Sequence, residues 1–528
     1  MRSRLHLQRS LIKTFEGNDT LMPLDIETVP SSSSLSIATA ALLLTACAPH
    51  DTVDAQEASE VVGSWRGGEV LAYQRPDSQV TVFSMREDSS LFISLIYEVG
   101  PRARVWTYDI DVEYQDGVIS WDYHTGQLNA TRDTMRVSKN YRGDRSEWMW
   151  VRDRGSDSLM EHVRTLEDTP FTYRVPPSQD DGWDCAEPED VGLDGERLSQ
   201  FLEQIAQGEF GDIHSVLLVR HDTLVVEEYF AERGRVHGPF IASVFRNRVH
   251  HLASTTKTVT SALIGIAIAQ GSIASAQDPI IRYLPDHHSL LSGEKEAITI
   301  EHLLTMSSGL QWSQSGQWSS SQNDAAAIWR TPDLVEYVLA KPLLAPPGQR
   351  FVYSNGSAAV VGAILENATG MELARFAEQH LFRQLGITDY LWTSYPDETV
   401  ETDGGLALRP RDLAKIGQAF LDHGRWHDVQ VIPEVWVAQS TQQRLSFGSV
   451  GAASLGYGYF WMQTDLPTSG GEVRSFFHPG DGEQLLMVIP ELDMVVVFTG
   501  GTYGTDVKRK YHAIISEHVL PAVDTGSR

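Results

Sequence analysis

Apolar and polar residues alternate over nine positions of the chain, residues 106–114. Successive side chains of an extended strand point to opposite faces, so this alternation predicts a β-strand with one buried face. Residues 115–117 (Gln-Asp-Gly) and then 118–121 follow, which is typical of a hairpin with a glycine-containing turn. Other β-like segments are 80–85, 91–99 and 147–151. Six to eight short strands in about 100 residues predict a small antiparallel barrel or sandwich.

The whole chain has 528 residues, which is typical of three or four structural units. Charged residues make up 21% and hydrophobic residues 41%, as in proteins that bury a sizeable core. Lys and Arg number 42 against 70 Asp and Glu, so the net charge is -28. Because phosphate binding needs concentrated positive charge, we expect no nucleic-acid partner.

The N-terminal part contains an apolar stretch at residues 35–44, well below the ~20 residues that span a bilayer. The stretch ends in Leu44-Thr45-Ala46-Cys47, which resembles a bacterial lipobox. The resemblance implies a signal peptide at 1–46 and lipidation of Cys47. The protein would then be exported and anchored to a bacterial membrane, facing the periplasm or the exterior. The alternative is a disordered N-terminus with an accidental match and a soluble protein.

The segments after Cys47 predict two folded domains. A spacer covers 47–59, and a β-rich domain covers 60–165. Gly63-Ser64-Trp65 resembles the opening of lipocalin-type barrels, and we interpret this domain as an accessory module. Residues 166–190 are rich in Pro and Asp, which is typical of a linker. The second domain, residues 191–523, mixes helices and strands. Its predicted elements are a helix at 193–205 and strands at 215–219, 223–229, 485–489 and 494–498.

The second domain contains the sequence Ser254-Thr255-Thr256-Lys257 at the start of a long apolar segment, residues 259–269. Positions three apart share one face of a helix, so the Ser254 hydroxyl and the Lys257 amine can lie within hydrogen-bonding reach. A serine is a weak nucleophile until a base removes its proton. A lysine amine acts as that base only if its surroundings lower its pKa from about 10.4. The alternative is a capping serine beside a surface lysine.

Two later motifs favour the catalytic interpretation. Tyr353-Ser354-Asn355 follows a Pro-Pro-Gly turn and precedes a predicted helix at 357–367. His478-Pro479-Gly480 leads into the predicted strand 485–489, which places His478 on or beside a sheet edge. The chain has no Gly-x-Ser-x-Gly elbow, zinc-binding His-Glu-x-x-His, Walker loop or Gly-x-Gly-x-x-Gly.

Together the three motifs resemble, in order and approximate spacing, those of serine β-lactamase-like proteins. The matching flanks are residues 299–310, 405–414 and 488–493. The resemblance covers about residues 182 to 520 and is nearest to the branch of class C β-lactamases, esterases, D-amino-acid peptidases, 6-aminohexanoate-oligomer hydrolases and penicillin-binding proteins. It implies an α+β catalytic domain with an antiparallel sheet, flanking helices and a helical lobe.

By this resemblance, Ser254 is the acylated nucleophile and Lys257 is its activating base. Tyr353 is a proton shuttle toward the leaving group, and Asn355 orients the substrate and Lys257. The resemblance also implies a substrate-binding strand with His478, Gly480 and Asp481. The oxyanion would be bound by the backbone N–H groups of Ser254 and Asp481.

One departure from the family pattern concerns the substrate. β-Lactamases have Lys-Thr-Gly as the third motif, and that lysine attracts the substrate carboxylate. Here the position is His478, which is mostly neutral at pH 7 if its pKa is near 6.5. We therefore predict a serine hydrolase of small esters or amides that works through an acyl-enzyme, without metal or organic cofactor. The alternatives are a D-amino-acid peptidase or amidase, a β-lactamase, or an inactive cell-surface binding protein on the same scaffold.

Overall fold

The computed structural model describes residues 170–231, 236–237, 242, 245–314, 322–503 and 506–523, together with eight strands between residues 63 and 152. The predicted signal peptide, Cys47 and the predicted spacer lie outside the described residues. No helix in the described ranges has the length and apolar character needed to span a bilayer.

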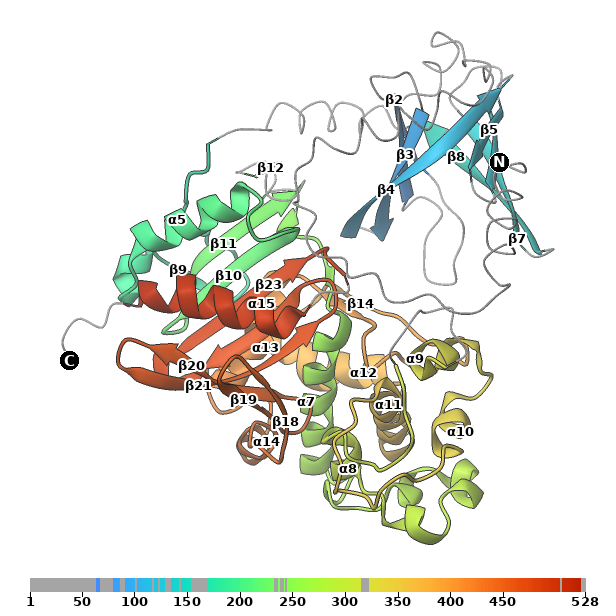
Figure 1. Ribbon diagram of the computed structural model, residues 1–528, viewed down its shortest axis with the longest axis vertical. Helices are drawn as coiled ribbons and strands as arrows, with labels where there is room; N and C mark the ends of the chain where they lie inside the picture. The colour runs from blue at the N-terminus through green and yellow to red at the C-terminus, as the bar shows by residue number, and fades with distance from the viewer. Residues whose placement is uncertain are drawn as a thin grey trace, which may run out of the picture. The chain divides into compact units, whose positions relative to one another are not determined.

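The eight N-terminal strands pair antiparallel, each with the next along the chain, and the first pairs with the last to close a barrel (Figure 1). They are β1 (Gly63–Arg66), β2 (Gln79–Met85), β3 (Leu91–Val99), β4 (Arg102–Gln115), β5 (Val118–Trp121), β6 (His124–Leu128), β7 (Thr134–Tyr141) and β8 (Asp144–Arg152). The strand predicted at 106–114 lies within β4. The limits 60–165 and the lipocalin-like interpretation stay predictions.

The centre of the second domain is a ten-stranded sheet in the order β12-β11-β10-β23-β22-β21-β20-β19-β18, with β9 beside β11. The strands are β9 (Asp184–Cys185), β10 (Ile213–Arg220), β11 (Thr223–Ala231), β12 (Val236–His237), β18 (Leu445–Val450), β19 (Ala453–Tyr457), β20 (Met462–Thr468), β21 (Gly471–Gly480), β22 (Gln484–Ile489) and β23 (Met494–Gly500). All pairs are antiparallel except β9 with β11. The predicted antiparallel sheet is therefore confirmed, with one short parallel strand added.

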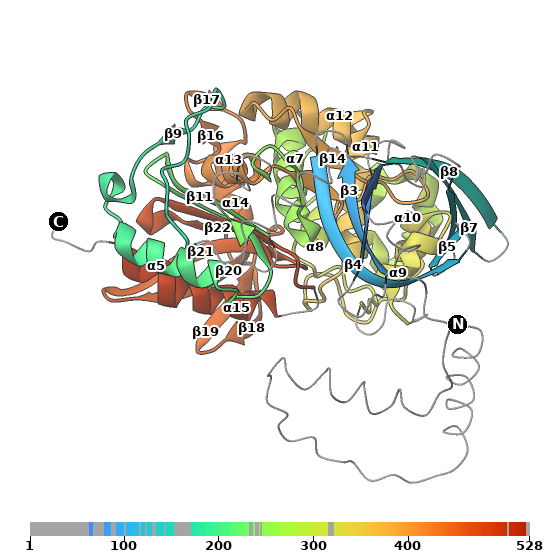
Figure 2. The same ribbon diagram turned by 90° about the horizontal axis from the view of Figure 1, so that it is seen from above.

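Helices cover both faces of this sheet, which explains why β22 and β23 are buried along their whole length rather than alternately. Figure 2 shows α13 (Pro410–Leu421) on one face and α5 (Gly195–Ala206) and α15 (Val507–Ile514) on the other. On β23, the Phe498 ring contacts Phe201 of α5 and Tyr511 of α15. Val495 lies three positions before Phe498, so its side chain points to the other face of the sheet. There it lies beside Gly417 of α13.

A long helix, α7 (Thr256–Ala269), lies between the sheet and a helical lobe (Figure 1). Almost all of its side chains are buried, including those of Lys257 and the Thr and Ser residues in its first half. The lobe contains α8 (Ile300–Leu304), α9 (Asp324–Ala327), α10 (Leu334–Leu339), α11 (Asn355–Thr369) and α12 (Leu373–Ala377). Gly265 lets α14 (Glu434–Ser440) approach α7, because a Cβ at Gly265 would lie 2.2 Å from the Trp436 ring.

The C-terminal part of the predicted linker packs onto the second domain. Strand β9 pairs with β11, and the neighbouring Trp183 is buried, with its indole N–H donating to the Arg411 carbonyl at 3.3 Å. The prolines and aspartates that indicated a linker therefore interrupt regular structure without detaching this segment from the core.

Candidate active site

Ser254 and Lys257 lie at the point where the chain turns into α7. Ser254 is the middle residue of a 3₁₀ turn, η3 (Ala253–Thr255), and Lys257 belongs to the first turn of the helix. Lys257 is fully buried, whereas Ser254 keeps partial exposure between buried neighbours. The Lys257 Nζ lies 3.1 Å from the Ser254 Oγ. The structure thus brings together the two groups that the three-residue spacing places on one face.

The Lys257 amine has three oxygen partners. They are Ser254 Oγ at 3.1 Å, Asn355 Oδ1 at 3.1 Å and the backbone carbonyl of Asp403 at 2.6 Å. An ammonium has three N–H donors and can satisfy all three. A neutral amine has two N–H donors and one lone pair, so it can donate to Asn355 and Asp403 and accept from the Ser254 hydroxyl. The same geometry therefore satisfies both protonation states, as a group that takes and returns one proton requires.

Tyr353 and Asn355 are positioned by the start of α11. Ser354 is the N-cap of this helix, and its hydroxyl accepts a hydrogen bond from the Ser357 N–H at 3.0 Å. The cap fixes the two residues on either side of it: Asn355 contacts the Lys257 amine, and the Tyr353 ring centroid lies 5.1 Å from that Nζ. The predicted site residues of the first two motifs, Ser254, Tyr353 and Asn355, thus meet at the Lys257 amine.

Strand β21 places the third motif beside η3. The Thr255 hydroxyl donates to the His478 carbonyl at 3.1 Å, and a Cβ on Gly480 would lie 2.3 Å from the Leu252 carbonyl oxygen. Only a glycine leaves room for the strand to approach this closely. The His478 and Tyr353 rings lie 6.4 Å apart, so the third motif faces the first two.

The His478 side chain is fully buried. Burial, and secondly the charge of Lys257, hold the pKa of His478 well below its usual value. Its Nδ1 lies 2.9 Å from the Pro479 carbonyl, which can only accept a hydrogen bond, so the neutral ring carries its proton on Nδ1. Its Nε2 is buried with no hydrogen-bond partner among the described residues. A neutral imidazole therefore stands where β-lactamases have a cation.

Asp481 lies in the turn between β21 and β22, and its side chain is exposed. The Asp481 carboxylate accepts a hydrogen bond from the Gly482 N–H at 3.1 Å. Asp481 thus follows the glycine that permits the close approach to η3, and its suggested role in oxyanion binding stays a prediction.

Sequence reasoning missed Asp403, whose backbone carbonyl accepts from the Lys257 amine, and Tyr395, which bonds to the Asp403 side chain. The Asp403 carboxyl is buried and accepts a hydrogen bond from the Tyr395 hydroxyl. Burial raises the pKa of Asp403, although Lys257 and the Tyr395 hydrogen bond act in the opposite direction. Asp403 comes two positions before the recognised segment 405–414, and no spacing rule links it to Lys257. Only the path of the loop between β14 (Tyr390–Trp392) and β15 (Leu406–Leu408) brings it there.

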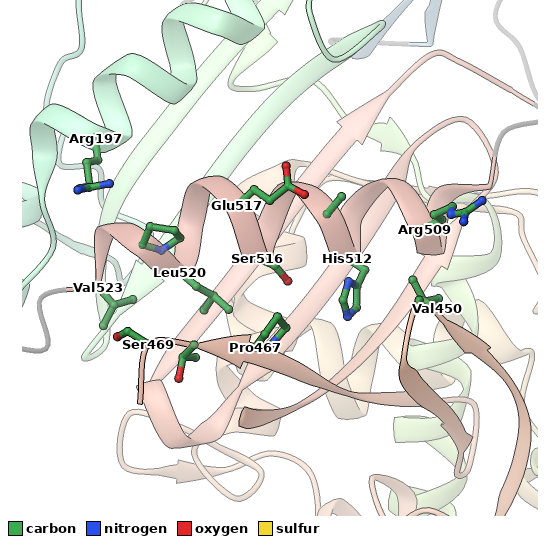
Figure 3. A pocket seen from close by; sticks show the side chains of 14 residues that line it. Arg197, Val450, Pro467, Ser469, Arg509, His512, Ser516, Glu517, Leu520 and Val523 are labelled. Carbon is green, nitrogen blue, oxygen red and sulfur yellow. The ribbon is translucent and has the colours of Figure 1, made fainter. Parts of the chain in front are cut away.

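A pocket of about 650 Å³ lies elsewhere, between the C-terminal helical segment and the end of β20 (Figure 3). Its lining includes Arg509, His512 and Ser516 from the helical segment and Pro467 from β20. None of the residues of the three motifs lines it. Within the described ranges, no group of three or more His, Cys, Asp or Glu side chains is arranged to hold a metal ion.

Comparison with known proteins identifies three hydrolases as relatives of this chain. The chain is 28% identical over 225 residues to the D-alanyl-D-alanine-carboxypeptidase/endopeptidase AmpH of Escherichia coli K12, covering 42% of this chain and 56% of that protein. It is 33% identical over 148 residues to the esterase EstB of Burkholderia gladioli, covering 26% and 37%. It is 26% identical over 208 residues to the 6-aminohexanoate-dimer hydrolase of Paenarthrobacter ureafaciens, covering 36% and 49%.

The matches thus span between 37% and 56% of the length of these relatives. The family model described as Beta-lactamase matches residues 211–517, more than half of the chain, and this range contains all three motifs. The resemblance inferred from those motifs is therefore confirmed, and the chain belongs to the serine β-lactamase-like family.

Proposed function

We propose that this protein hydrolyses small esters or amides through an acyl intermediate on Ser254. The observation that carries the proposal is the position of the Lys257 amine, which is fully buried and lies 3.1 Å from the Ser254 hydroxyl. Its three oxygen partners can complete its hydrogen bonds both as an ammonium and as a neutral amine. A buried amine with these partners is suited to accept the serine proton at the moment of attack.

The proposed reaction has two acyl-transfer steps. In the first, the Ser254 O–H bond breaks, its proton goes to the Lys257 nitrogen, and Oγ forms a bond to the acyl carbon. The backbone N–H groups of Ser254 and Asp481 would stabilise the oxyanion. Tyr353 would donate its phenol proton to the leaving group as the bond between the leaving group and the acyl carbon breaks, and Lys257 would return the serine proton to Tyr353. In the second step, water would lose a proton to Lys257 while its oxygen bonds to the acyl carbon. The bond between Oγ and the acyl carbon would then break, and Oγ would take that proton from Lys257.

The neutral state of His478 supports uncharged substrates. A cation at this position would attract a carboxylate, whereas an imidazole with a strongly lowered pKa carries no charge near pH 7. This disfavours β-lactams, whose carboxylate needs an anchor. The relatives support esters and amides, since their names include an esterase and a 6-aminohexanoate-dimer hydrolase. A D-amino-acid peptidase is the second candidate, because the match to AmpH covers a larger share of this chain than the match to EstB.

A substrate panel with one variant tests the proposal. The purified full chain is assayed with p-nitrophenyl esters, an aminohexanoate dimer, a D-alanyl-D-alanine peptide and a cephalosporin. We expect turnover of the esters or small amides, little of the cephalosporin, and a loss of roughly 10⁴-fold or more in kcat/KM for Ser254→Ala. Ser272→Ala, three residues beyond the C-terminal end of α7, is the control and should keep full activity.

Two outcomes would contradict the proposal. Retained turnover in Ser254→Ala would reject Ser254 as the nucleophile. A folded wild-type protein without turnover of any substrate on the panel would favour the binding-protein interpretation.

A further inference from the structure

Three aromatic side chains pack together beside the segment that carries Tyr353. Phe351 precedes Tyr353 by two residues, Phe447 belongs to β18, and Tyr457 belongs to β19. The Phe351 ring stacks on the Phe447 ring, with centroids 4.7 Å apart, and it contacts the Tyr457 ring at 5.0 Å. The Phe447 and Tyr457 rings lie 5.8 Å apart, edge to face. We call Phe351, Phe447 and Tyr457 the aromatic wall.

The members of the aromatic wall differ in burial. Tyr457 is fully buried and supports Phe351 from within the protein. Phe351 and Phe447 are half-buried, so each keeps part of its surface accessible. A ligand group that covers apolar surface gains free energy in proportion to the area removed from water, and ligand sites are accordingly lined with aromatic side chains. The two accessible rings can therefore bind an apolar group.

A β-bulge gives Phe447 its place in the aromatic wall. Phe447 lies on β18, the edge strand of the sheet, and the register between β18 and β19 shifts between Ser446 and Gly448. Phe447 is thus the extra residue of the bulge. A bulge changes the direction of a side chain, and bulges are frequent beside active sites. The flanking residues Ser446 and Gly448 are exposed, whereas the Phe447 ring stacks on Phe351.

The aromatic wall adjoins the reacting groups through Tyr353. Burial, and secondly the Tyr353 phenol, raise the pKa of Tyr457 well above its usual value, so the two phenols lie within electrostatic range of each other. The Tyr353 ring in turn lies 5.1 Å from the Lys257 Nζ. A substrate group that extends from the acyl carbon past Tyr353 therefore meets the aromatic wall.

We propose that the aromatic wall binds the leaving group of the substrate, and that this leaving group is an alcohol or amine that carries an aromatic ring. The proposal rests on the proposed function, in which Tyr353 donates a proton to the leaving group. The rest of the leaving group must then lie beside Tyr353, as the wall does. Phe351 and Phe447 accept its ring by stacking or edge contacts, and the acyl chain lies away from the wall.

The test compares benzyl and methyl esters of butyric acid in the wild type and in Phe447→Ala. The two alcohols are nearly equal in acidity, so the ratio of the two kcat/KM values reports contacts rather than leaving ability. We expect the wild type to prefer the benzyl ester. The ratio should fall roughly 10-fold or more in the variant, as is typical of a lost apolar contact in a substrate pocket. If only amides are accepted, the N-benzyl and N-methyl amides replace the esters.

Two results of this comparison would overturn the proposal. One is a wild type without a preference for the benzyl substrate. The other is an unchanged ratio in a folded Phe447→Ala protein.

Two further variants make the test specific. Phe447→Leu keeps an apolar side chain but removes the flat ring, so its ratio should lie between those of the wild type and Phe447→Ala. It also provides the test if Phe447→Ala fails to fold, and an unchanged ratio would then count against the proposal. Phe210→Ala is the matched control: this ring is also half-buried and contacts Phe201 at 5.5 Å, beside α5. Its loss should lower stability and leave the ratio unchanged.

Single-turnover kinetics separate the leaving group from the acyl group. Both substrates place the same butyryl group on Ser254, and the alcohol or amine has left before water attacks. The rate of deacylation should therefore be the same in the wild type and in Phe447→Ala, while acylation by the benzyl substrate slows. A slower deacylation with an unchanged benzyl-to-methyl ratio would assign the aromatic wall to the acyl group and overturn the proposal.

The outcome for this proposal is separable from that of the proposed function. If turnover depends on Ser254 but the ratio does not respond to Phe447, only the role of the aromatic wall is rejected. If turnover survives in Ser254→Ala, the proposed function fails first, and the role of the wall, which is assigned through Tyr353, fails with it.

Discussion

At the scale of single residues, the proposed preference for uncharged substrates depends on the uncharged state of His478. Its imidazole is fully buried and its pKa is held well below the usual value, so it stays neutral as the pH falls from 8 to 6. A histidine with an ordinary pKa would gain its charge in this range.

We therefore predict that His478 contributes no titration to catalysis between pH 6 and pH 8. His478→Gln removes the ring and should lower kcat/KM, because the ring faces Tyr353. It should leave the midpoints of the pH profile within about 0.3 units of the wild type. The measurement is kcat/KM across pH 5 to 9 for both proteins. A wild-type limb near pH 6.5 that disappears in the variant would show that His478 is charged in the working enzyme.

The residues of the site differ in how far the sequence predicts them. Ser254 and Lys257 follow from helix geometry, because a spacing of three residues places them on one face. Tyr353 and His478 follow from motif order, and the structure places the Tyr353 ring beside the Lys257 amine and the His478 ring beside Tyr353. Asp403 does not follow from either. Its nearness to Lys257 depends on tertiary structure, and a buried acid has no mark in the sequence that distinguishes it from an exposed one.

At the scale of elements, the site depends on how closely β21 approaches η3. The approach is limited by Gly480, where an added Cβ would lie 2.3 Å from the Leu252 carbonyl oxygen. The neighbouring contact between Thr255 and the His478 carbonyl belongs to the same junction. A shift of β21 would therefore move His478 and Asp481 away from Ser254 together.

Gly480→Ala tests this junction. Overpacking typically costs about 1–3 kcal/mol, and misplacement of a catalytic group by 1 Å costs about 10²-fold in rate, so we expect both a lower melting temperature and a lower kcat. Gly448→Ala is the matched control, since it lies in β18 of the same sheet with no atom within 4 Å of the added Cβ. Equal activity of the two variants would show that the close approach of β21 is not required.

The elements also show where sequence patterns are informative. The strands predicted at 215–219 and 485–489 lie within β10 and β22, because their apolar runs reflect burial on both faces. The helix predicted at 193–205 corresponds to α5, which begins two residues later and ends one residue later than predicted. Strand β9 was missed because two residues form it and pairing with β11, rather than its own sequence, makes it a strand.

At the scale of the whole molecule, acidic groups inside the fold link stability to pH. Glu228 on β11 is buried, and burial raises its pKa from 4.5 to about 7. The folded state thus binds a proton at this group between pH 4.5 and 7 that the unfolded chain does not hold. The contribution of this group to the free energy of unfolding is therefore fully present below pH 4.5 and is lost as the pH rises through about 7.

We predict that Glu228→Gln is more stable than the wild type at pH 8, by about 2–3 kcal/mol from a shift of this size, and similar to it at pH 4.5. Thermal unfolding followed by circular dichroism at the two pH values measures the difference. Glu203→Gln, an exposed position on α5, is the control and should show no such change with pH. A gain for Glu228→Gln that is the same at both pH values would contradict the raised pKa.

The overall architecture was predictable to the extent that the three motifs and their flanks identify the family. The match to residues 211–517 confirms that identification, and the sheet with its helical lobe follows from it. The position of the linker segment could not be predicted in the same way. Its packing depends on the burial of Trp183 beside Arg411. The nearby prolines, in contrast, are typical of a linker that does not pack on a domain.

The central claim is that Ser254 becomes covalently acylated, and trapping with a fluorophosphonate probe measures this most directly. The full-length wild type and Ser254→Ala are incubated with the probe, digested, and analysed by mass spectrometry. The account predicts one adduct per chain, located on Ser254 and lost in the variant. An adduct on a different residue, with Ser254 unmodified while the enzyme turns over its substrate, would contradict it.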